Sequence, residues 1–107
     1  MFAVVYRFEV IPSKEESFIQ AWKTLTQLIY KHEGSLGSRL HLSANNTYLA
    51  YAQWPSKTIW ENAGKHMPPE ADKVCKQMKE SCKRIETIHT MDLVEDLLQQ
   101  TIHNKDQ

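Results

Sequence analysis

The sequence predicts an α+β domain in which helices cover one face of a four-stranded antiparallel sheet. Three observations lead to this fold class. The chain has 107 residues without an internal break in composition, which suits one hydrophobic core rather than two. Four stretches alternate apolar and polar residues with the period of a strand, and the segments between them carry helical spacing or helix-capping residues. In chain order the elements read strand, helix, strand, strand, helix, strand.

The first strand and the first helix occupy the N-terminal third of the chain. Residues 2–11 alternate without interruption, and Pro12 ends the strand. Ser13 and Glu16 have the spacing of a capping box, in which each side chain accepts from a free amide at the start of a helix. The helix should cover about residues 14–33, because apolar positions recur every three or four residues until a glycine follows.

The two middle strands are predicted over residues 35–43 and 47–54, with three residues between them. Two of those three are asparagines, which tolerate left-handed backbone angles. A two-residue loop would set Leu42 against Leu49. We favour a three-residue loop, because it groups the apolar residues of each strand. It gives these opposite pairs: Leu36 and Trp54, Ser38 and Ala52, Leu40 and Ala50, Leu42 and Tyr48.

The remaining elements follow a proline-rich bend. Ser56 should cap a short helix to about Lys65, and prolines at 68 and 69 then precede a second helical stretch to about Lys83. Its buried stripe would be Ala71, Val74, Cys75, Met78 and Cys82. Residues 84–94 alternate as the last strand. The domain therefore spans residues 1–94, and the tail 95–107, with Leu97, Leu98 and Ile102, is apolar enough for a short helix or a partner-clasping segment.

This element order is the split βαβ motif of ferredoxin-like folds, in which right-handed crossovers place both helical layers on one sheet face. The other face would be bare, yet it mixes apolar and polar side chains: Val5, Ile11, Leu49, Tyr51, Ile88 and Val94 with Arg7, Glu9, Arg39, His41 and Gln53. That is too apolar for a face left wholly in water, so we expect a second copy to cover it as a homodimer.

Composition excludes several other classes of partner. Thirteen basic and thirteen acidic side chains leave no positive excess for nucleic acid. The longest apolar run, residues 2–6, is too short for a membrane span, and we expect a cytoplasmic protein. Cys75 and Cys82 lie two helical turns apart, which suits buried thiols better than a disulfide. His32, His41 and His103 lack metal-site spacing, so no metal is expected.

Four segments together resemble one known family. They are the strand at residues 2–10, F-x-x-A-W at Phe18 to Trp22, GSLGSRLH at 34–41, and TYLAYAQWPSKTIWE at 47–61. The order and spacing are similar to the antibiotic biosynthesis monooxygenase (ABM) domain of the dimeric α/β-barrel superfamily, over about residues 2–94. That resemblance implies small homodimers, whose members include cofactor-free monooxygenases of aromatic polyketides, haem-degrading enzymes, and quinol or signal-molecule enzymes.

The helix-facing side of the sheet is the expected binding site. Its middle carries small residues, namely Ser38, Ala50, Ala52 and Thr87, which would leave room between sheet and helices. Aromatic and polar groups would surround that room as in small-molecule pockets, from Tyr6, Trp22, Trp54 and His89, with Trp60 a further substrate contact. The alternative is that helix side chains fill the gap.

Two histidines are candidate acid–base groups. His66, in the bend before the prolines, is the preferred one, and His89 is the other if it faces inward. The competing interpretations are an exposed loop histidine and a hydrogen-bonded core histidine. Tyr6 or Trp54 would donate to an oxyanion while an electron-rich phenol or anthrone reduces dioxygen without a cofactor. The alternative function is a non-catalytic dimeric binding domain.

Haem degradation is the less favoured option. The haem-degrading branch of the resembled family uses an Asn on the first strand, a Trp in the short helix and a His in the next helix. Aligned on Trp54, these positions hold Tyr6, Ala63 and Lys73 in this sequence. The sequence therefore predicts a chain that works without haem or any other cofactor.

Overall fold

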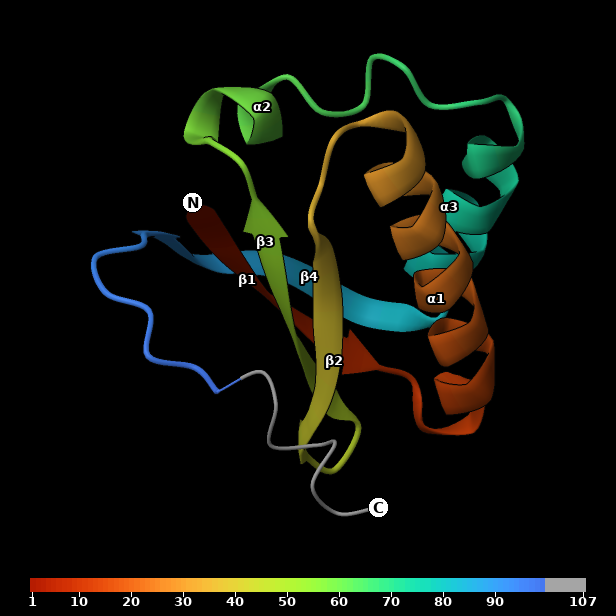
Figure 1. The fold of residues 1–107 in the computed structure, drawn as a ribbon. Coiled ribbons are helices and arrows are strands. Elements are labelled where there is room, and N and C mark those ends of the chain that lie inside the picture. Colours follow the sequence, from red (N-terminus) through yellow and green to blue (C-terminus); the bar gives the residue numbers. More distant parts are fainter. Residues whose placement is uncertain (100–107) are drawn as a thin grey trace, which may run out of the picture.

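The computed structural model describes residues 1–99 and has a single four-stranded antiparallel sheet with helices on one face (Figure 1). The strand order is β2-β3-β1-β4, as the βαββαβ sequence of elements predicts. The α+β ferredoxin-like fold is therefore confirmed. Its elements are β1 Phe2–Val10, a 3₁₀ turn at Pro12–Lys14, α1 Glu15–His32, β2 Gly37–Ala44, β3 Thr47–Trp54, α2 Lys57–Glu61, α3 Glu70–Glu80 and β4 Cys82–Asp92.

The core lies between β1, β3 and α1. Phe18 of α1 is completely buried, and its ring centre lies 4.9 Å from that of Phe8 and 5.2 Å from that of Tyr48. A second group of buried residues lies nearer the start of β1, and it consists of Phe2, Val4, Ala52 and Trp54. The alternate residues of β1 therefore face the helices, as the sequence pattern predicts.

The start of α1 differs from the prediction. Ser13 lies within the 3₁₀ turn, and no side chain caps the helix, whose N-cap is Lys14. The predicted capping box between Ser13 and Glu16 is therefore absent. Glu15 instead accepts a hydrogen bond from the hydroxyl of buried Tyr48, which fastens the first turn of α1 to β3.

The β2–β3 hairpin has the predicted register but a shorter turn. Leu42 lies opposite Tyr48, Leu40 opposite Ala50, and Ser38 opposite Ala52. The turn itself is Asn45–Asn46, with Asn46 at a φ of 60°, and Ala44 already pairs with Thr47. A register shift between Leu42 and Ala44 takes up the extra residue. The predicted Leu36–Trp54 pair lies just outside the ladder, which begins at Gly37.

The register of β4 overturns one prediction. A shift between Val5 and Tyr6 of β1 leaves Val5 opposite His89 and Tyr6 opposite Thr87. Because opposite residues in an antiparallel pair share a face, Thr87 faces the helices as expected, whereas His89 faces away from them. The inward orientation predicted for His89 is wrong, since unbroken alternation cannot anticipate a bulge.

Both cysteines are half-buried and free, but they lie on different elements. Cys75 lies on α3, whereas Cys82 begins β4 opposite Val10. The predicted helix to Lys83 is therefore too long, because α3 ends at Glu80 and the strand starts two residues early. Burial raises the pKa of the Cys82 thiol to about 11, so this group is a neutral packing residue.

The segment between β3 and α3 crosses over one end of the sheet (Figure 1). Ser56 caps α2 as predicted, since its hydroxyl accepts from the amide of Ile59 at 3.2 Å. The helix ends at Glu61 rather than near Lys65, and Gly64 then has a φ of +105°. The chain reaches α3 through residues 62–69, which we call the crossover loop.

Both long helices pack on the same face of the sheet, and the other face is open in the described part of the chain (Figure 1). Residues 93–99 have no regular secondary structure, and Leu93, Val94, Leu97 and Leu98 are exposed. Ile102 and His103 of the predicted tail lie outside the described residues. No helix within residues 1–99 is long and apolar enough to cross a membrane.

Candidate functional site

A cavity of about 250 Å³ lies between the sheet and the helices, and we call it the central cavity. Its walls come from β1, β2, β3 and β4 on one side and from α1 and α3 on the other. Nearly all of its lining is apolar. The lining residues are Tyr6, Phe8, Trp22, Leu25, Thr26, Ile29, Ser35, Ser38, Ala52, Trp54, Met78 and Ile85.

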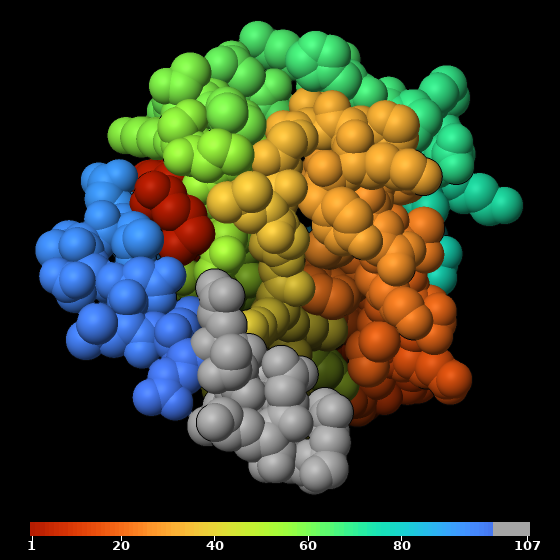
Figure 2. All heavy atoms as spheres, in the orientation of Figure 1, coloured from red at the N-terminus to blue at the C-terminus, as the bar shows by residue number. Residues whose placement is uncertain are grey.

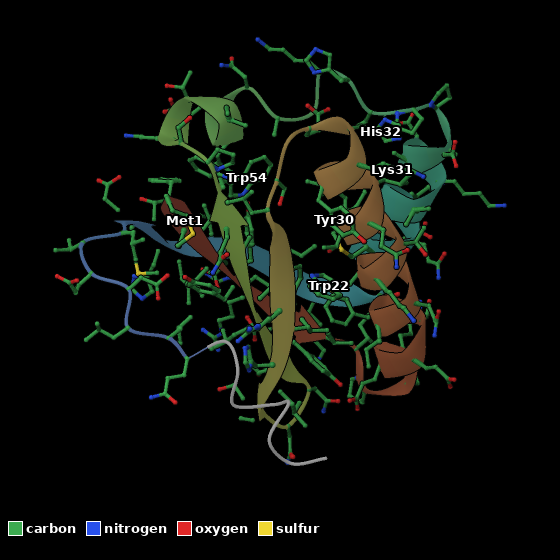
Figure 3. The ribbon with its side chains drawn as sticks, in the orientation of Figure 1. Met1, Trp22, Tyr30, Lys31, His32 and Trp54 are labelled. Atoms are coloured by element: carbon green, nitrogen blue, oxygen red, sulfur yellow. The ribbon has the colours of Figure 1, made fainter. Side chains whose placement is uncertain are left out.

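The cavity exists because small residues lie where the sheet meets the helices. Ser38 of β2 and Ala52 of β3 are opposite each other, and together they leave a space that larger side chains would fill. Figure 3 shows Trp22 extending from α1 toward the sheet and Trp54 at the end of β3. The structure thus brings together Tyr6, Trp22, Ser38, Ala52 and Trp54 of the residues predicted from the sequence.

Tyr6 lies in the middle of the site and keeps its phenolic proton. Its hydroxyl oxygen accepts a hydrogen bond from Nε1 of Trp60 at 2.9 Å, which leaves the O–H free to donate. Burial raises the pKa of Tyr6 above its ordinary value, although the Trp60 hydrogen bond opposes that effect. Tyr6 is therefore suited to donate a hydrogen bond to a ligand, and it is a poor base.

Trp54 supplies the most informative polar atom of the cavity. The residue is only 3% exposed, and its indole N–H has no hydrogen-bond partner among residues 1–99. A buried donor without a partner costs about 1–3 kcal/mol, so native proteins rarely keep one without a use. Trp54 also lines the cavity, but this nitrogen is itself shielded from the cavity, so it would reach a ligand only if the side chain shifted.

A second hollow of about 330 Å³ lies next to the central cavity, beneath the crossover loop. The two share four lining residues, namely Tyr6, Leu25, Ile29 and Trp54. We call this second space the loop-side hollow. Its own lining is Glu33, Trp60, Ala63, Gly64, Met67, Ala71, Asp72 and Cys75. Trp60, which the sequence analysis placed in the site, therefore lines the second space and contacts the first through Tyr6.

Glu33 fastens the crossover loop to the end of α1. Its side chain is 2% exposed, and its oxygens accept from the backbone amide of His66 at 2.7 Å and lie 3.2 Å from the imidazole Nδ1. Burial alone would raise the pKa of Glu33, but the hydrogen bonds from His66 and from the Gly64 amide outweigh burial and lower it. Sequence reasoning missed this residue, because a glutamate at a helix end is usually solvated.

The two histidines proposed as bases lie outside the central cavity. The side chain of His66 is 73% exposed and is held from behind by Glu33. His89 lies on the opposite face of the sheet. Thr87 faces the helices but does not line the cavity. Within residues 1–99, Tyr6 is the only titratable side chain that lines the central cavity, and no three metal-ligating side chains come together.

The family model that matches this chain is that of antibiotic biosynthesis monooxygenases, over residues 1–67. The chain belongs to the antibiotic biosynthesis monooxygenase family. A comparison with curated proteins finds no significant match. The matched part of the ABM domain includes β1 to α2 and so carries most of the central cavity.

Solved structures share the ABM fold at low sequence identity. SnoaB, a cofactor-independent oxygenase from Streptomyces nogalater, has a TM-score of 0.71 and 16% identity, covering 92% of this chain and 97% of its own. A candidate antibiotic biosynthesis monooxygenase from Caulobacter crescentus has a TM-score of 0.73 and 19% identity, covering 88% of this chain and 90% of its own. Rv0793 from Mycobacterium tuberculosis has a TM-score of 0.70 and 14% identity, covering 91% of this chain and 98% of its own. These likenesses establish the fold of this ABM chain.

Proposed function

We propose that this ABM chain is a cofactor-independent monooxygenase that oxidises a small aromatic or quinone-like molecule in the central cavity. The observation that carries the proposal is the apolar central cavity with the free O–H of Tyr6 in its wall and the buried, unpartnered N–H of Trp54 beside it. An aromatic ring with an anionic oxygen would satisfy that donor and the free O–H of Tyr6 at once. The family of the chain and its fold agree with this chemistry.

The proposed reaction uses the substrate as the reductant. An anthrone, once deprotonated, passes electrons to dioxygen and forms a carbon–oxygen bond at the carbon that lost the proton. Loss of water then leaves a carbonyl, so one oxygen atom stays in the quinone and the other departs as water with both hydrogens of the methylene carbon. The chain would supply two donors for the anion and a largely apolar, water-poor space.

The absence of a base from the lining favours a substrate that ionises readily. None of the described residues around the central cavity is a histidine, a carboxylic acid or a lysine. Such a cavity suits a phenol or anthrone that arrives as its anion, because Trp54 and Tyr6 then lower the free energy of the charged form. His66 remains a candidate for taking the proton near the protein surface.

Oxygen consumption with anthrone tests the proposal. The native chain should consume one dioxygen per anthraquinone formed, and Trp54→Phe should lower kcat by about 100-fold, as loss of one oxyanion donor does in other enzymes. Tyr30→Phe, on the exposed side of α1, is the matched control and should leave the rate unchanged. His66→Ala would slow the reaction only if the imidazole takes the proton. No uptake by the pure native chain would exclude the monooxygenase.

One observation favours a second candidate function, a non-catalytic binding domain for a small hydrophobic molecule. The lining of the central cavity has donors but no acid–base pair, which is enough for binding and little for proton transfer. Saturable binding of a phenol without any oxygen uptake would select this alternative. Haem degradation is the weaker third possibility, because Ala63 lines only the loop-side hollow and Lys73 is exposed on α3. A shift of the Soret band when haem is added to the chain would support haem degradation instead.

A further inference from the structure

The central cavity and the loop-side hollow are neighbours that share part of their lining. Four residues line both spaces, and among them Tyr6 is the one with a hydrogen bond to a residue that lines only the loop-side hollow. Leu25 and Ile29 project from α1, while Trp54 belongs to the buried core. The wall between the two spaces therefore depends on where the ring of Tyr6 is held.

Trp60 holds that ring in place. Its Nε1 donates to the Tyr6 hydroxyl at 2.9 Å, and its own ring is tilted against Phe2 with centroids 5.6 Å apart. Trp60 lies on α2, which the Ser56 cap anchors directly after β3. A single hydrogen bond thus connects the side chain of Tyr6 to α2 at the edge of the site.

We propose that Tyr6, held by Trp60, is a partition that sets the length of the ligand. This inference rests on the proposed function, since it concerns a molecule bound in the central cavity. With Tyr6 tethered, the ligand is confined to the central cavity. When the tether is lost, Tyr6 can move aside and a longer molecule extends into the loop-side hollow.

The sizes of the two spaces agree with such a partition. A cavity of about 150 Å³ accommodates benzene. The central cavity, at about 250 Å³, therefore fits roughly two to three fused rings, the size of anthrone. The loop-side hollow has about 330 Å³, so the joined space falls well within the range of about 300–1,000 Å³ that drug-sized ligands occupy. A four-ring molecule would need both spaces.

The chemistry of the walls fixes which end of a long ligand goes where. The loop-side hollow presents Trp60, Ala63, Met67 and Ala71, together with the Glu33 carboxylate, whose oxygens already accept from the crossover loop. A negative oxygen would be repelled there. The acidic oxygen of the ligand therefore belongs in the central cavity, and its uncharged rings belong under the crossover loop.

Binding of two phenols of different length tests the partition. We would measure Kd by titration calorimetry for 2-naphthol, which has two rings, and for 1-hydroxypyrene, which has four. The native chain should prefer 2-naphthol. In Trp60→Phe, which loses the N–H and keeps a ring, that preference should fall by about tenfold at most, the loss expected for one hydrogen bond. Tyr6→Leu should reverse the preference.

Tyr30→Phe is the matched control, because Tyr30 lies outside both spaces, and it should keep the native preference. Circular dichroism decides whether Tyr6→Leu folds; if it does not, Trp60→Phe alone decides the inference. An unchanged preference in the folded variants would overturn the partition while leaving the proposed function intact. If the native chain binds neither phenol, the proposed function fails and the partition fails with it.

Discussion

Two tryptophans six residues apart differ in one hydrogen bond, and that difference organises the site. The indole N–H of Trp60 is satisfied by Tyr6, whereas that of Trp54 is buried without a partner in the described chain. Both rings contribute apolar surface to the same region. The sequence shows two tryptophans near the end of a strand, but only the packing around them decides which donor remains for a ligand.

Replacing Trp54 by phenylalanine should separate stability from binding. The substitution removes an unsatisfied buried donor, which restores about 1–3 kcal/mol. It also removes apolar ring volume, which costs an amount of similar size. The midpoint of thermal unfolding should therefore change little, while affinity for 2-naphthol should fall. Scanning calorimetry and titration calorimetry measure the two effects. A large loss of thermal stability would show that the N–H is satisfied in solution.

At the scale of elements, the crossover loop is attached to α1 mainly through one carboxylate. The backbone amides of Gly64 and His66 and the imidazole of His66 all donate toward Glu33. The attachment is ionic only while Glu33 is deprotonated, and its folded pKa lies below the usual value of 4.5. The crossover loop, which covers the loop-side hollow, is therefore held in place in a pH-dependent manner.

The pH dependence of unfolding should report this attachment. Because the folded pKa of Glu33 is lowered, its contribution to the free energy of unfolding is fully present above pH 4.5 and disappears as pH falls through the folded pKa. Glu33→Gln should lose stability at pH 7 and show a weaker dependence between pH 5 and about pH 3. Urea unfolding across that range measures the free energy of unfolding at each pH. Glu61→Gln, which changes an exposed glutamate, is the control. If the free energy of unfolding of the native chain and that of Glu33→Gln fell in parallel with pH, Glu33 would not be the source of the pH dependence.

The elements themselves follow from the sequence except where backbone irregularities intervene. Alternation and helical spacing predict four strands, both long helices and the hairpin register, because burial of one face imposes those periods. They cannot predict the extra residue in β4, so His89 was placed on the wrong face. The capping box at Ser13 also failed, since Pro12 favours a 3₁₀ turn there. Four of the five residues around the cavity lie on strands where alternation holds, and Trp22 lies on the apolar stripe of α1, so both periods predicted them.

At the scale of the whole molecule, the open sheet face carries apolar side chains that nothing in the described chain covers. It carries Val5, Leu49 and Tyr51 among charged side chains, and no helix of the described residues covers it. Figure 2 shows the side on which α1 and β2 lie next to each other, with a hollow between them that is lined by Trp22 of α1 and by Ser38 and Leu40 of β2. The helices cover one face of the sheet, and we propose that a second copy covers the open face.

Charge placed on the open face should prevent that association. Leu49 lies between Arg7 of β1 and His41 of β2, so Leu49→Glu has basic neighbours in a monomer and should still fold. In a homodimer the same carboxylate would be buried against the other copy, which is costly. Light scattering after size exclusion should show a dimer for the native chain and a monomer for this variant. Leu42→Glu, on the helix-facing side of β2, should remain dimeric; a monomeric native chain would refute the proposal.

The irregularity in β4 also bears on how this chain tolerates changes of length. Removing Ile88 would give β4 uniform alternation, and His89 and Met91 would stay on the open face while Thr90 and Asp92 stay on the helical side. A single-residue deletion elsewhere in this strand would instead turn the residues on one side of the deletion over to the other face. The crossover loop could absorb the same deletion with a local rearrangement. Among relatives of this protein, length should therefore vary in that loop and, within β4, only at the position of Ile88.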